Sequence, residues 1–342
     1  MQNKRVPLLF ALFAGGLAAG WFARQRQLER QFEFRERVVV ITGASRGLGF
    51  VLARQLVEQG AKVVLLARNE QHLRRAETEL TANGGTALGI PCDIKDQAQV
   101  NAAIERAMQE FGRVDVLINN AGTIQVGPLD SMTMKDFESA MAVHFYGSLH
   151  TTLAVLPHMR RAGGGRIVNI SSIGGKIALP HMVPYTASKF ALVGLSDALR
   201  AELRRENIFV TTVCPGLMRT GSPANAHFKG NHQAEYTWFA VADSLPIISM
   251  NAERAAKKIL KACQHKTSHI VLSLPAKAAV LFSELLPGVT ARISAGVNCA
   301  LPENAPGEGK ELHTGWESQS RFAPSLLTHL SEKAAVRNNQ LP

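Results

Sequence analysis

A short apolar run followed by a glycine-rich turn constrains the fold more than any other stretch of the chain. Residues 37–45 (RVVVITGAS) are β-branched and apolar up to the first glycine, which predicts a buried parallel strand. The turn continues through Gly43, Gly47 and Gly49 with the spacing G-x-x-x-G-x-G, and a helical pattern follows. Such glycines let the backbone approach a pyrophosphate, whose charge the helix N-terminus holds. The alternative is an unspecialised glycine-rich loop.

The alternation of strand and helix patterns continues beyond this turn. Further strands are expected at 62–67, 86–93 and 114–118, and helices at 69–83 and 96–112. Strands separated by helices of this length imply right-handed crossovers. The sequence therefore predicts an α/β fold with a doubly wound, Rossmann-type parallel sheet flanked by helices.

Two arginines stand at the points that select between dinucleotides. Arg46 lies in the glycine-rich turn, and Arg68 ends the strand expected at 62–67, where no Asp or Glu is found. An acidic residue near this strand end takes the ribose hydroxyls of NAD, whereas a basic one accommodates the extra phosphate of NADP. Each arginine alone would be an ordinary surface charge. Together they predict a guanidinium site for a 2′-phosphate and favour NADP(H) as cofactor.

A tyrosine and a lysine are spaced for proton transfer. Tyr185 and Lys189 lie four residues apart in a predicted helix, so the ammonium can sit beside the phenol. A fixed cation stabilises the phenolate and lowers the phenol pKa from its ordinary value of about 10. Tyr185 is therefore a candidate general acid or base at a carbonyl or alcohol oxygen. The pair alone also fits a solvated helix face, so the assignment depends on the other motifs.

Five ordered motifs resemble those of the classical short-chain dehydrogenases/reductases, over about residues 36–273. The motifs are T-G-x-x-x-G-x-G from Thr42, N-N-A-G from Asn119, Ser172 thirteen residues before the tyrosine, Y-x-x-x-K from Tyr185, and Cys214-Pro215-Gly216 with Thr220. The three-residue gap after Gly43 is similar to the classical branch rather than the extended branch. The resemblance implies an NADP(H)-dependent oxidoreductase that interconverts a ketone or aldehyde and an alcohol.

The resemblance also implies roles for the matching residues. Tyr185 would relay the proton to the substrate oxygen, and Lys189 would hold the nicotinamide ribose and lower the tyrosine pKa. Ser172, which the thirteen-residue spacing selects over Ser171, would hydrogen-bond the same oxygen, so Ser172 and Tyr185 are the expected substrate contacts. The residues expected to line the cofactor are Gly43, Ser45, Arg46, Gly47, Leu48, Gly49, Arg68, Asp93, Ile94, Asn120, Ala121, Gly122, Tyr185, Lys189, Pro215, Gly216 and Thr220. For Asp93 the alternative is a helix cap.

His144 departs from the family pattern, which usually has Asn at this position to hold a water beside the lysine. An imidazole can also hydrogen-bond a water or relay a proton near neutral pH, so His144 is a catalytic candidate. If His144 only packs in its helix, the relay is slower or absent. The alternative function is therefore a catalytically silent NADP-binding redox sensor or scaffold at the membrane.

The N-terminal stretch predicts a membrane anchor. Residues 6–23 carry no charge, and basic residues flank them on both sides. This length is at the lower edge for a transmembrane helix. The larger basic flank, which follows the run, favours a catalytic domain on the cytoplasmic side. We expect residues 1–35 to form a retained anchor with its flank; a cleaved signal ending near 18–20 is the alternative.

The catalytic domain is expected to span 36–274, with a substrate loop at 219–247. The aromatic residues of this loop form either an apolar lid or the core of a short helix. They are Phe228, Tyr236, Trp238 and Phe239. Segment 275–301 is apolar but broken by proline and glycine, so it either dips into a membrane interface or docks on the fold. Residues 302–342 are predicted to be a polar tail, with a linker and then a short helix at 324–336.

Charge and cysteine content limit the partners. The net charge of +11 favours an anionic partner, but no basic run is interleaved with aromatic residues, so nucleic acid is not expected. The four cysteines lack metal-ligand spacing, which predicts no metal and a reducing compartment. The anchor and the aromatic loop suggest an apolar, lipid-like carbonyl or alcohol as substrate. The family resemblance suggests a homo-oligomer.

Overall fold

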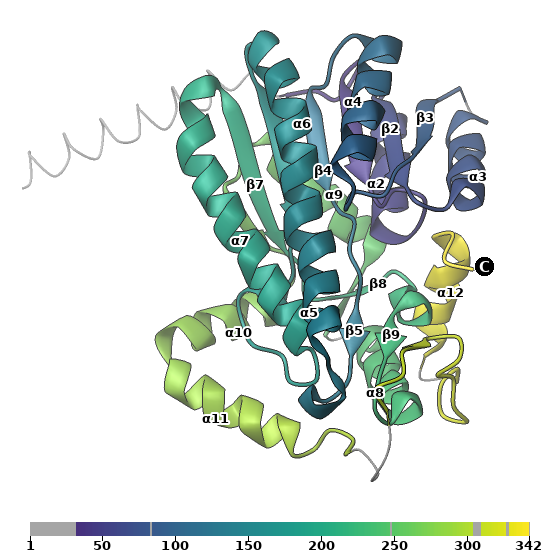
Figure 1. Cartoon of the computed structure of the whole chain (residues 1–342), viewed down its shortest axis with the longest axis vertical. Helices are drawn as coiled ribbons and strands as arrows, with labels where there is room; N and C mark the ends of the chain where they lie inside the picture. Colours follow the sequence, from purple (N-terminus) through teal and green to yellow (C-terminus); the bar gives the residue numbers. More distant parts are fainter. Residues whose placement is uncertain (1–31, 83, 247, 304–308, 326–327, 342) are drawn as a thin grey trace, which may run out of the picture. The chain divides into compact units, whose positions relative to one another are not determined.

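The central sheet of the protein is parallel throughout (Figure 1). Its spatial order is β11-β7-β6-β4-β1-β2-β3. The strands are β1 (Val38–Thr42), β2 (Lys62–Ala67), β3 (Thr86–Pro91), β4 (Val116–Asn119), β6 (Gly165–Ile170), β7 (Ile208–Cys214) and β11 (His269–Val271). The order reverses between β1 and β4, so the carboxyl ends of these two strands form the switch point where doubly wound sheets bind ligands. The predicted α/β fold with a doubly wound, Rossmann-type parallel sheet is confirmed.

The computed structural model describes residues 32–82, 84–246, 248–303, 309–325 and 328–341. The chain divides into a first unit, Met1–Glu33, and a second unit, Phe34–Pro342, which holds the sheet. The anchor expected at 1–35 lies almost wholly outside the described residues. Of the helices within the described ranges, none combines the length and the apolar character needed to cross a bilayer.

Helices cover both faces of the sheet. In Figure 1, α4, α6 and α7 lie in front of the strands, and α2 and α9 lie behind them. The helices of this layer structure are α2 (Gly47–Glu58), α3 (Glu70–Thr81), α4 (Gln97–Phe111), α5 (Met134–Met141), α6 (Gly147–Arg161), α7 (Val183–Leu203) and α9 (Ala252–Gln264). The expected starts of α3 and α9 are confirmed, because the side chain of Asn69 accepts from the backbone N–H of His72 and that of Asn251 accepts from Arg254.

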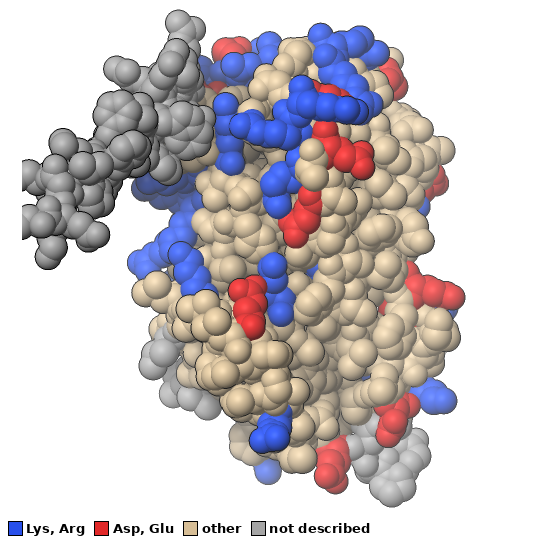
Figure 2. All heavy atoms as spheres, turned by 90° about the vertical axis from the view of Figure 1, so that its left-hand side faces the viewer, with Lys and Arg blue, Asp and Glu red and all other residues tan. Residues whose placement is uncertain are grey.

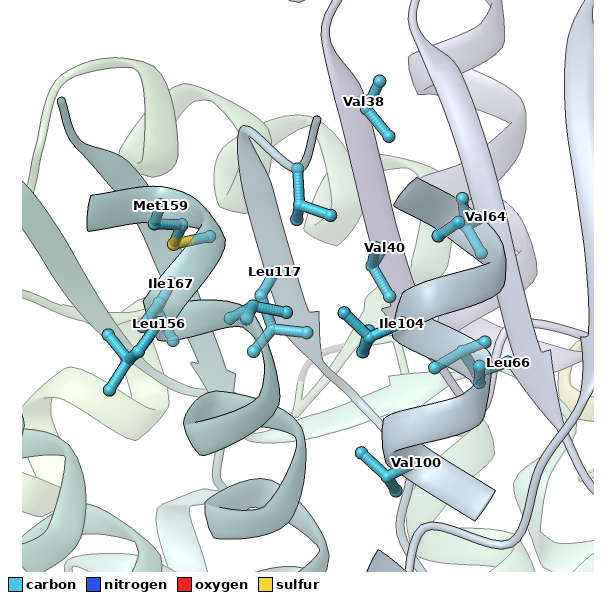
Figure 3. Packing of buried hydrophobic residues seen from close by; sticks show 14 of the residues in the cluster. Val38, Val40, Val64, Leu66, Val100, Ile104, Leu117, Leu156, Met159 and Ile167 are labelled. Atoms are coloured by element: carbon cyan, nitrogen blue, oxygen red, sulfur yellow. The ribbon is translucent and has the colours of Figure 1, made fainter. Parts of the chain in front are cut away.

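The main core lies between the sheet and the helices in front of it (Figure 3). Val40, Leu66 and Leu117 point from three neighbouring strands toward Ile104 of α4, and all four are fully buried or nearly so. Burying each such side chain contributes about 1.5–3 kcal/mol. The β-branched runs that predicted buried strands therefore supply the layer that fixes the carboxyl edge of the sheet.

A second, smaller layer is built from segments that lie between the strands of the sheet or after them in sequence. It comprises β5 (Gln125–Val126), β8 (Leu217–Arg219), β9 (His227–Phe228), α8 (His232–Ser244), β10 (Ser249–Asn251) and β12 (His313–Thr314). Phe228, Tyr236 and Phe239 are buried together in the core of this layer. Of the two expectations for these residues, an apolar lid or core packing, the structure shows core packing. Trp238 packs at the edge of this cluster and donates from Nε1 to Glu235 Oε2 over 2.6 Å.

Two C-terminal segments behave in opposite ways. Helices α10 (Leu274–Leu285) and α11 (Pro287–Asn298) project from the fold with Leu274 80% and Leu285 68% exposed. In Figure 2 the lower part of this face, where the two helices lie in Figure 1, is sparsely charged, whereas Lys and Arg gather above it. The described part of the polar tail instead packs on the fold, because β12 pairs with β9 and α12 (His329–Arg337) lies against α8.

Candidate active site

The catalytic candidates meet where β6 and α7 come together. In α7, Lys189 Nζ lies 5.7 Å from the ring centre of Tyr185 and donates to the carbonyl oxygen of Ile170 over 3.0 Å. Ser172, just beyond β6, lies close enough to the tyrosine phenol to lower its pKa, and its Oγ accepts from the backbone N–H of Gly174 over 3.0 Å. The structure thus brings the predicted serine, tyrosine and lysine together.

The neighbouring serine has a different place. Ser171 Oγ donates to the backbone carbonyl of Lys189 over 3.0 Å, and Ser171 is buried. Successive residues of an extended segment point to opposite sides, which is why one serine faces the phenol and the other ties the loop to α7. Ser172, the serine that the thirteen-residue spacing selects, is therefore the one on the side of the phenol.

Burial controls the protonation of this cluster. Burial raises the pKa of Tyr185 to about 12, although the hydrogen bond from Ser172 acts in the opposite direction. Burial also lowers the pKa of Lys189 to about 8. The sequence led us to expect a lowered tyrosine pKa. In the structure the loss of hydration outweighs the effect of Ser172, so Tyr185 is a neutral hydrogen-bond donor at neutral pH.

His144 lies in a π-helical turn, Ala142–Tyr146, beside the same cluster. Its Nε2 accepts from the backbone N–H of Thr123 over 3.1 Å, so Nδ1 carries the proton and donates to Ser188 Oγ over 2.7 Å. The Ser188 hydroxyl in turn donates to the backbone carbonyl of Tyr185. Burial, together with the Lys189 ammonium, lowers the pKa of His144 well below its usual range. Both nitrogens of a neutral imidazole are therefore engaged.

The glycine-rich turn packs tightly against the end of β4. A Cβ on Gly43 would lie 2.8 Å from Ala121 Cα, and one on Gly49 would lie 2.5 Å from Asn120 Nδ2. The Asn120 side chain also donates to the backbone carbonyls of Thr42 and Gly43. These contacts explain why glycine and asparagine are needed here, and they hold the first turn of α2 at the switch point.

Positive charge gathers at the end of β2. Arg46 precedes α2 and donates to Asn225 Oδ1, while Arg68 is exposed at the strand end. Burial, and next the charge of Arg68, lowers the pKa of Arg46. Burial followed by the two arginines lowers the pKa of His227, and burial followed by Arg46 and Arg75 lowers that of His72. These groups form a cationic cluster beside the turn.

Comparison with known proteins identifies the family. A sequence model described as short chain dehydrogenase matches residues 37–229. The chain belongs to the short-chain dehydrogenase family. Dehydrogenase/reductase SDR family member 7B of Bos taurus is 36% identical over 268 residues, which cover 76% of this chain and 81% of the relative. The family supports oxidoreductase chemistry on alcohols and carbonyls.

Solved structures of this family share the fold. A short-chain dehydrogenase/reductase of Burkholderia phymatum, solved in complex with NAD, superposes with a TM-score of 0.68 at 26% identity, over 75% of this chain and 96% of that one. A 3-ketoacyl-(acyl-carrier-protein) reductase of Brucella melitensis, complexed with NADH, gives 0.62 at 26% identity, over 70% and 98%.

The remaining predicted cofactor residues also lie along the carboxyl edge of the sheet. Asp93 follows β3, where its carboxylate accepts from the backbone N–H of Lys95, whereas Asp96 caps α4. A Cβ on Gly122 would lie 3.2 Å from His144 Nε2 and 3.8 Å from Lys189 Nζ. The others in this group follow β3 or β7, or occupy the turn itself. They are Ser45, Gly47, Leu48, Ile94, Pro215, Gly216 and Thr220.

Sequence reasoning missed several residues at this site. Asn225, between β8 and β9, and His227, in β9, approach Arg46. Ser188 lies between His144 and the Tyr185 backbone. The tail at 338–340 reaches the glycine-rich turn. Of these residues, only Ser188 could have been predicted from the sequence, because it lies within the Y-x-x-x-K segment. The other contacts join residues far apart in sequence.

Proposed function

We propose that this short-chain dehydrogenase is an NADP(H)-dependent oxidoreductase that interconverts a ketone or aldehyde and an alcohol on an apolar, lipid-like substrate. The family supports the class of reaction. The observation that carries the proposal is the cluster in which the half-buried Tyr185 phenol lies beside the buried Ser172 and Lys189. Further proposals are membrane anchoring on the cytoplasmic side through residues 6–23, and a homo-oligomer.

The residues of the turn fit a nicotinamide dinucleotide. Among the described residues, the N-cap side chain of α2 makes no hydrogen bond to the first turn, so it does not compete with an anion for the helix dipole. Gly43 and Gly49 give the close backbone packing that this approach needs. Lys189 would hold the nicotinamide ribose. When bound, the cofactor supplies or accepts the hydride.

The side chains of this chain handle the oxygen and its proton. Ser172 orients the carbonyl oxygen by a hydrogen bond and stabilises its developing negative charge. Tyr185, neutral because burial raises its pKa to about 12, donates its phenol proton to that oxygen during reduction. The Lys189 ammonium stabilises the phenolate that remains. In oxidation the same phenolate takes the proton from the alcohol.

The cationic cluster favours NADP(H) over NAD(H). A 2′-phosphate would form charge-assisted hydrogen bonds with Arg46 and Arg68 and relieve their mutual repulsion. His227 lies close enough for both arginines to lower its pKa. The two structural relatives above were solved with NAD and NADH, so this preference rests on the arginines of this chain.

His144 is proposed to be a positioning residue. Its hydrogen bonds tie the loop at Thr123 to α7 through Ser188, next to the Tyr185 backbone. A neutral, fully hydrogen-bonded imidazole supports an ordered catalytic cluster. This arrangement argues against the silent sensor or scaffold.

An apolar substrate is supported by the surroundings of Tyr185. Its ring and Leu179 pack against the second core, which includes the buried Met182 and Tyr236. A long apolar chain beside the phenol would bury surface at about 25 cal/mol per Å². We therefore expect the affinity for the substrate to rise with its apolar length.

The test is NADPH and NADH oxidation by the detergent-solubilised full chain, with ketones graded from small and polar to long and apolar. We expect NADPH to be preferred and kcat/KM to rise with apolar length. Equal use of the two cofactors would contradict the assignment of Arg46 and Arg68 to the 2′-phosphate of NADP(H). Tight NADPH binding with no turnover of any ketone would instead support the silent alternative.

A further inference from the structure

The last residues of the chain reach the glycine-rich turn. Helix α12 ends in a Schellman motif, because Gln340 N–H donates to Ala335 O and Asn339 takes a left-handed conformation with φ 54°. This turn directs Asn338–Leu341, which we name the strap, toward the start of α2. Figure 1 shows α12 and the marked C-terminus close to the α3 side of the sheet. A segment predicted to be a polar tail is thus fixed in place.

The strap binds both walls of the proposed dinucleotide site. On the turn, Gly47 N–H donates to Asn338 O over 2.8 Å, and Asn339 Nδ2 donates to Ser45 O over 2.7 Å. On the loop after β8, Asn225 Nδ2 donates to Gln340 O over 2.8 Å and to its Oε1 over 2.9 Å. Asn225 is also the residue that accepts from Arg46. The strap therefore bridges the glycine-rich turn and the loop that faces it.

The strap also takes the space that the glycine leaves open. A Cβ on Gly47 would lie 2.7 Å from Gln340 Nε2, so the Gln340 amide packs against the bare side of this glycine. Glycine at such a turn lets the backbone approach a pyrophosphate. The Gly47 N–H, which belongs to the first turn of α2, is meanwhile paired with the strap. Strap and phosphate therefore compete for the same turn.

We propose that the strap is a gate that closes the NADP(H) site and must be released before the cofactor enters. This inference rests on the proposed function. The closed state is held by neutral hydrogen bonds, whereas phosphate oxygens would form stronger, charge-assisted ones to the same turn and to Arg46. The cofactor can therefore displace the strap, at the expense of part of its affinity.

Release of the strap does not require release of α12. The helix is fixed separately, because Ser331 Oγ donates to the buried Asp243 over 2.7 Å and Arg337 pairs with Glu253 over 3.1 Å. Helix ends open more readily than their middles. Only the Schellman turn and the contacts of the strap have to open.

The main test measures NADPH binding to the full chain and to a variant that ends at Arg337. Protein and NADPH are mixed by stopped flow, and binding is monitored by tryptophan fluorescence. A site that is closed about nine-tenths of the time weakens apparent affinity about ten-fold. We therefore expect the truncated protein to bind NADPH about ten-fold faster and more tightly. Slower or weaker NADPH binding by the truncated protein would contradict the gate, and would show that the strap helps to bind the cofactor. An unchanged rate and affinity would also overturn it.

Two point variants guard against misfolding of the truncated chain. Asn339→Gly keeps the left-handed turn and removes the contact with Ser45, and Gln340→Ala removes the amide from Gly47. Each is expected to increase the NADPH association rate about two- to five-fold. Lys333→Ala, on the exposed side of α12, is the control and should change nothing. Point variants with rates equal to the control would contradict the gate.

Hydrogen exchange separates the strap from the proposed function. If neither the full chain nor the truncated chain binds NADPH, the proposed function fails. Exchange at the Gly47 amide then tests the strap alone, since truncation should accelerate it. Where NADPH does bind, we expect it to increase exchange within the strap. A strap that NADPH protects would overturn the gate.

Discussion

The two ends of the site are built on different physical principles. At the catalytic end, Lys189 and His144 are buried and Tyr185 is half-buried. Loss of hydration is the main cause that raises the phenol pKa, lowers the imidazole pKa and lowers the lysine pKa to about 8. At the adenosine end, Arg46 and Arg68 place two cations close together. Loss of hydration shifts the pKa values at the catalytic end, and at the other end we propose that the concentrated positive charge selects the cofactor.

The largest expected effect removes the phenol at the catalytic end. Tyr185→Phe should lower the rate of ketone reduction about 10³-fold, because a positioned general acid contributes about 10²–10⁴-fold. The dissociation constant for NADPH should stay within about two-fold. Single-turnover kinetics and fluorescence titration measure the two quantities.

The exposed Tyr146 supplies the matched control. Tyr146→Phe makes the same chemical change away from the cluster and should leave both quantities unchanged. A Tyr185→Phe variant that reduces ketones at the natural rate would show that the Tyr185 phenol is not the proton donor.

The next effect removes charge at the adenosine end. Arg46→Ala and Arg68→Ala should each weaken NADPH binding about 10- to 100-fold, since a hydrogen bond to a charged group contributes about 1.5–3 kcal/mol. NADH binding should change little, because NADH lacks the phosphate. Arg74→Ala on α3, whose side chain is exposed, is the control. Equal losses for both cofactors would assign the arginines to the rest of the dinucleotide.

The third prediction concerns pH at the catalytic end. Burial lowers the Lys189 pKa to about 8, so the ammonium is present below this pH and is lost above it. For ketone reduction, kcat/KM should therefore fall about ten-fold per pH unit above pH 8, while the Tyr185 phenol stays protonated. Lys189→Arg should remove this fall, because a guanidinium keeps its proton to above pH 12. A flat profile up to pH 10 in the natural chain would show that the lysine charge is not required.

The smallest effect concerns His144. His144→Asn keeps polar groups near Thr123 and Ser188, so kcat should stay within about five-fold with an unchanged pH profile. His144→Leu leaves both partners unpaired and should lower the free energy of unfolding by about 1–3 kcal/mol. Rate and thermal stability are measured together on both variants. A change in the pH profile of His144→Asn would make the histidine a proton relay rather than a positioning residue.

Local patterns in the sequence predicted the framework well. The strand expected at 62–67 is β2 with the same bounds, and the helix caps at Asn69 and Asn251 are found. The predicted strand at 86–93 is shorter, since β3 ends at Pro91. Period, cap and glycine signals succeed because the structure they encode is decided by neighbours within a few residues.

The sequence predicted the structure of the C-terminal third less well, because the amino-acid composition of these segments does not indicate which of them are buried. The polar tail was expected to be a linker and a short helix of unknown role, yet its Asn338 is 2% exposed and reaches a turn near residue 47. The apolar segment at 275–301 leaves Leu274 and Leu285 largely exposed. Which of these segments packs depends on the surface that each meets.

The sequence alone determined the parallel sheet, the family motifs and the residues that meet at the carboxyl edge, because those follow from local periodicity and spacing. The tertiary structure decided the pKa direction of Tyr185, the hydrogen bonds of His144 and the contact between the strap and Gly47. Desolvation and long-range hydrogen bonds arise only when distant segments meet. No local pattern in the chain encodes them.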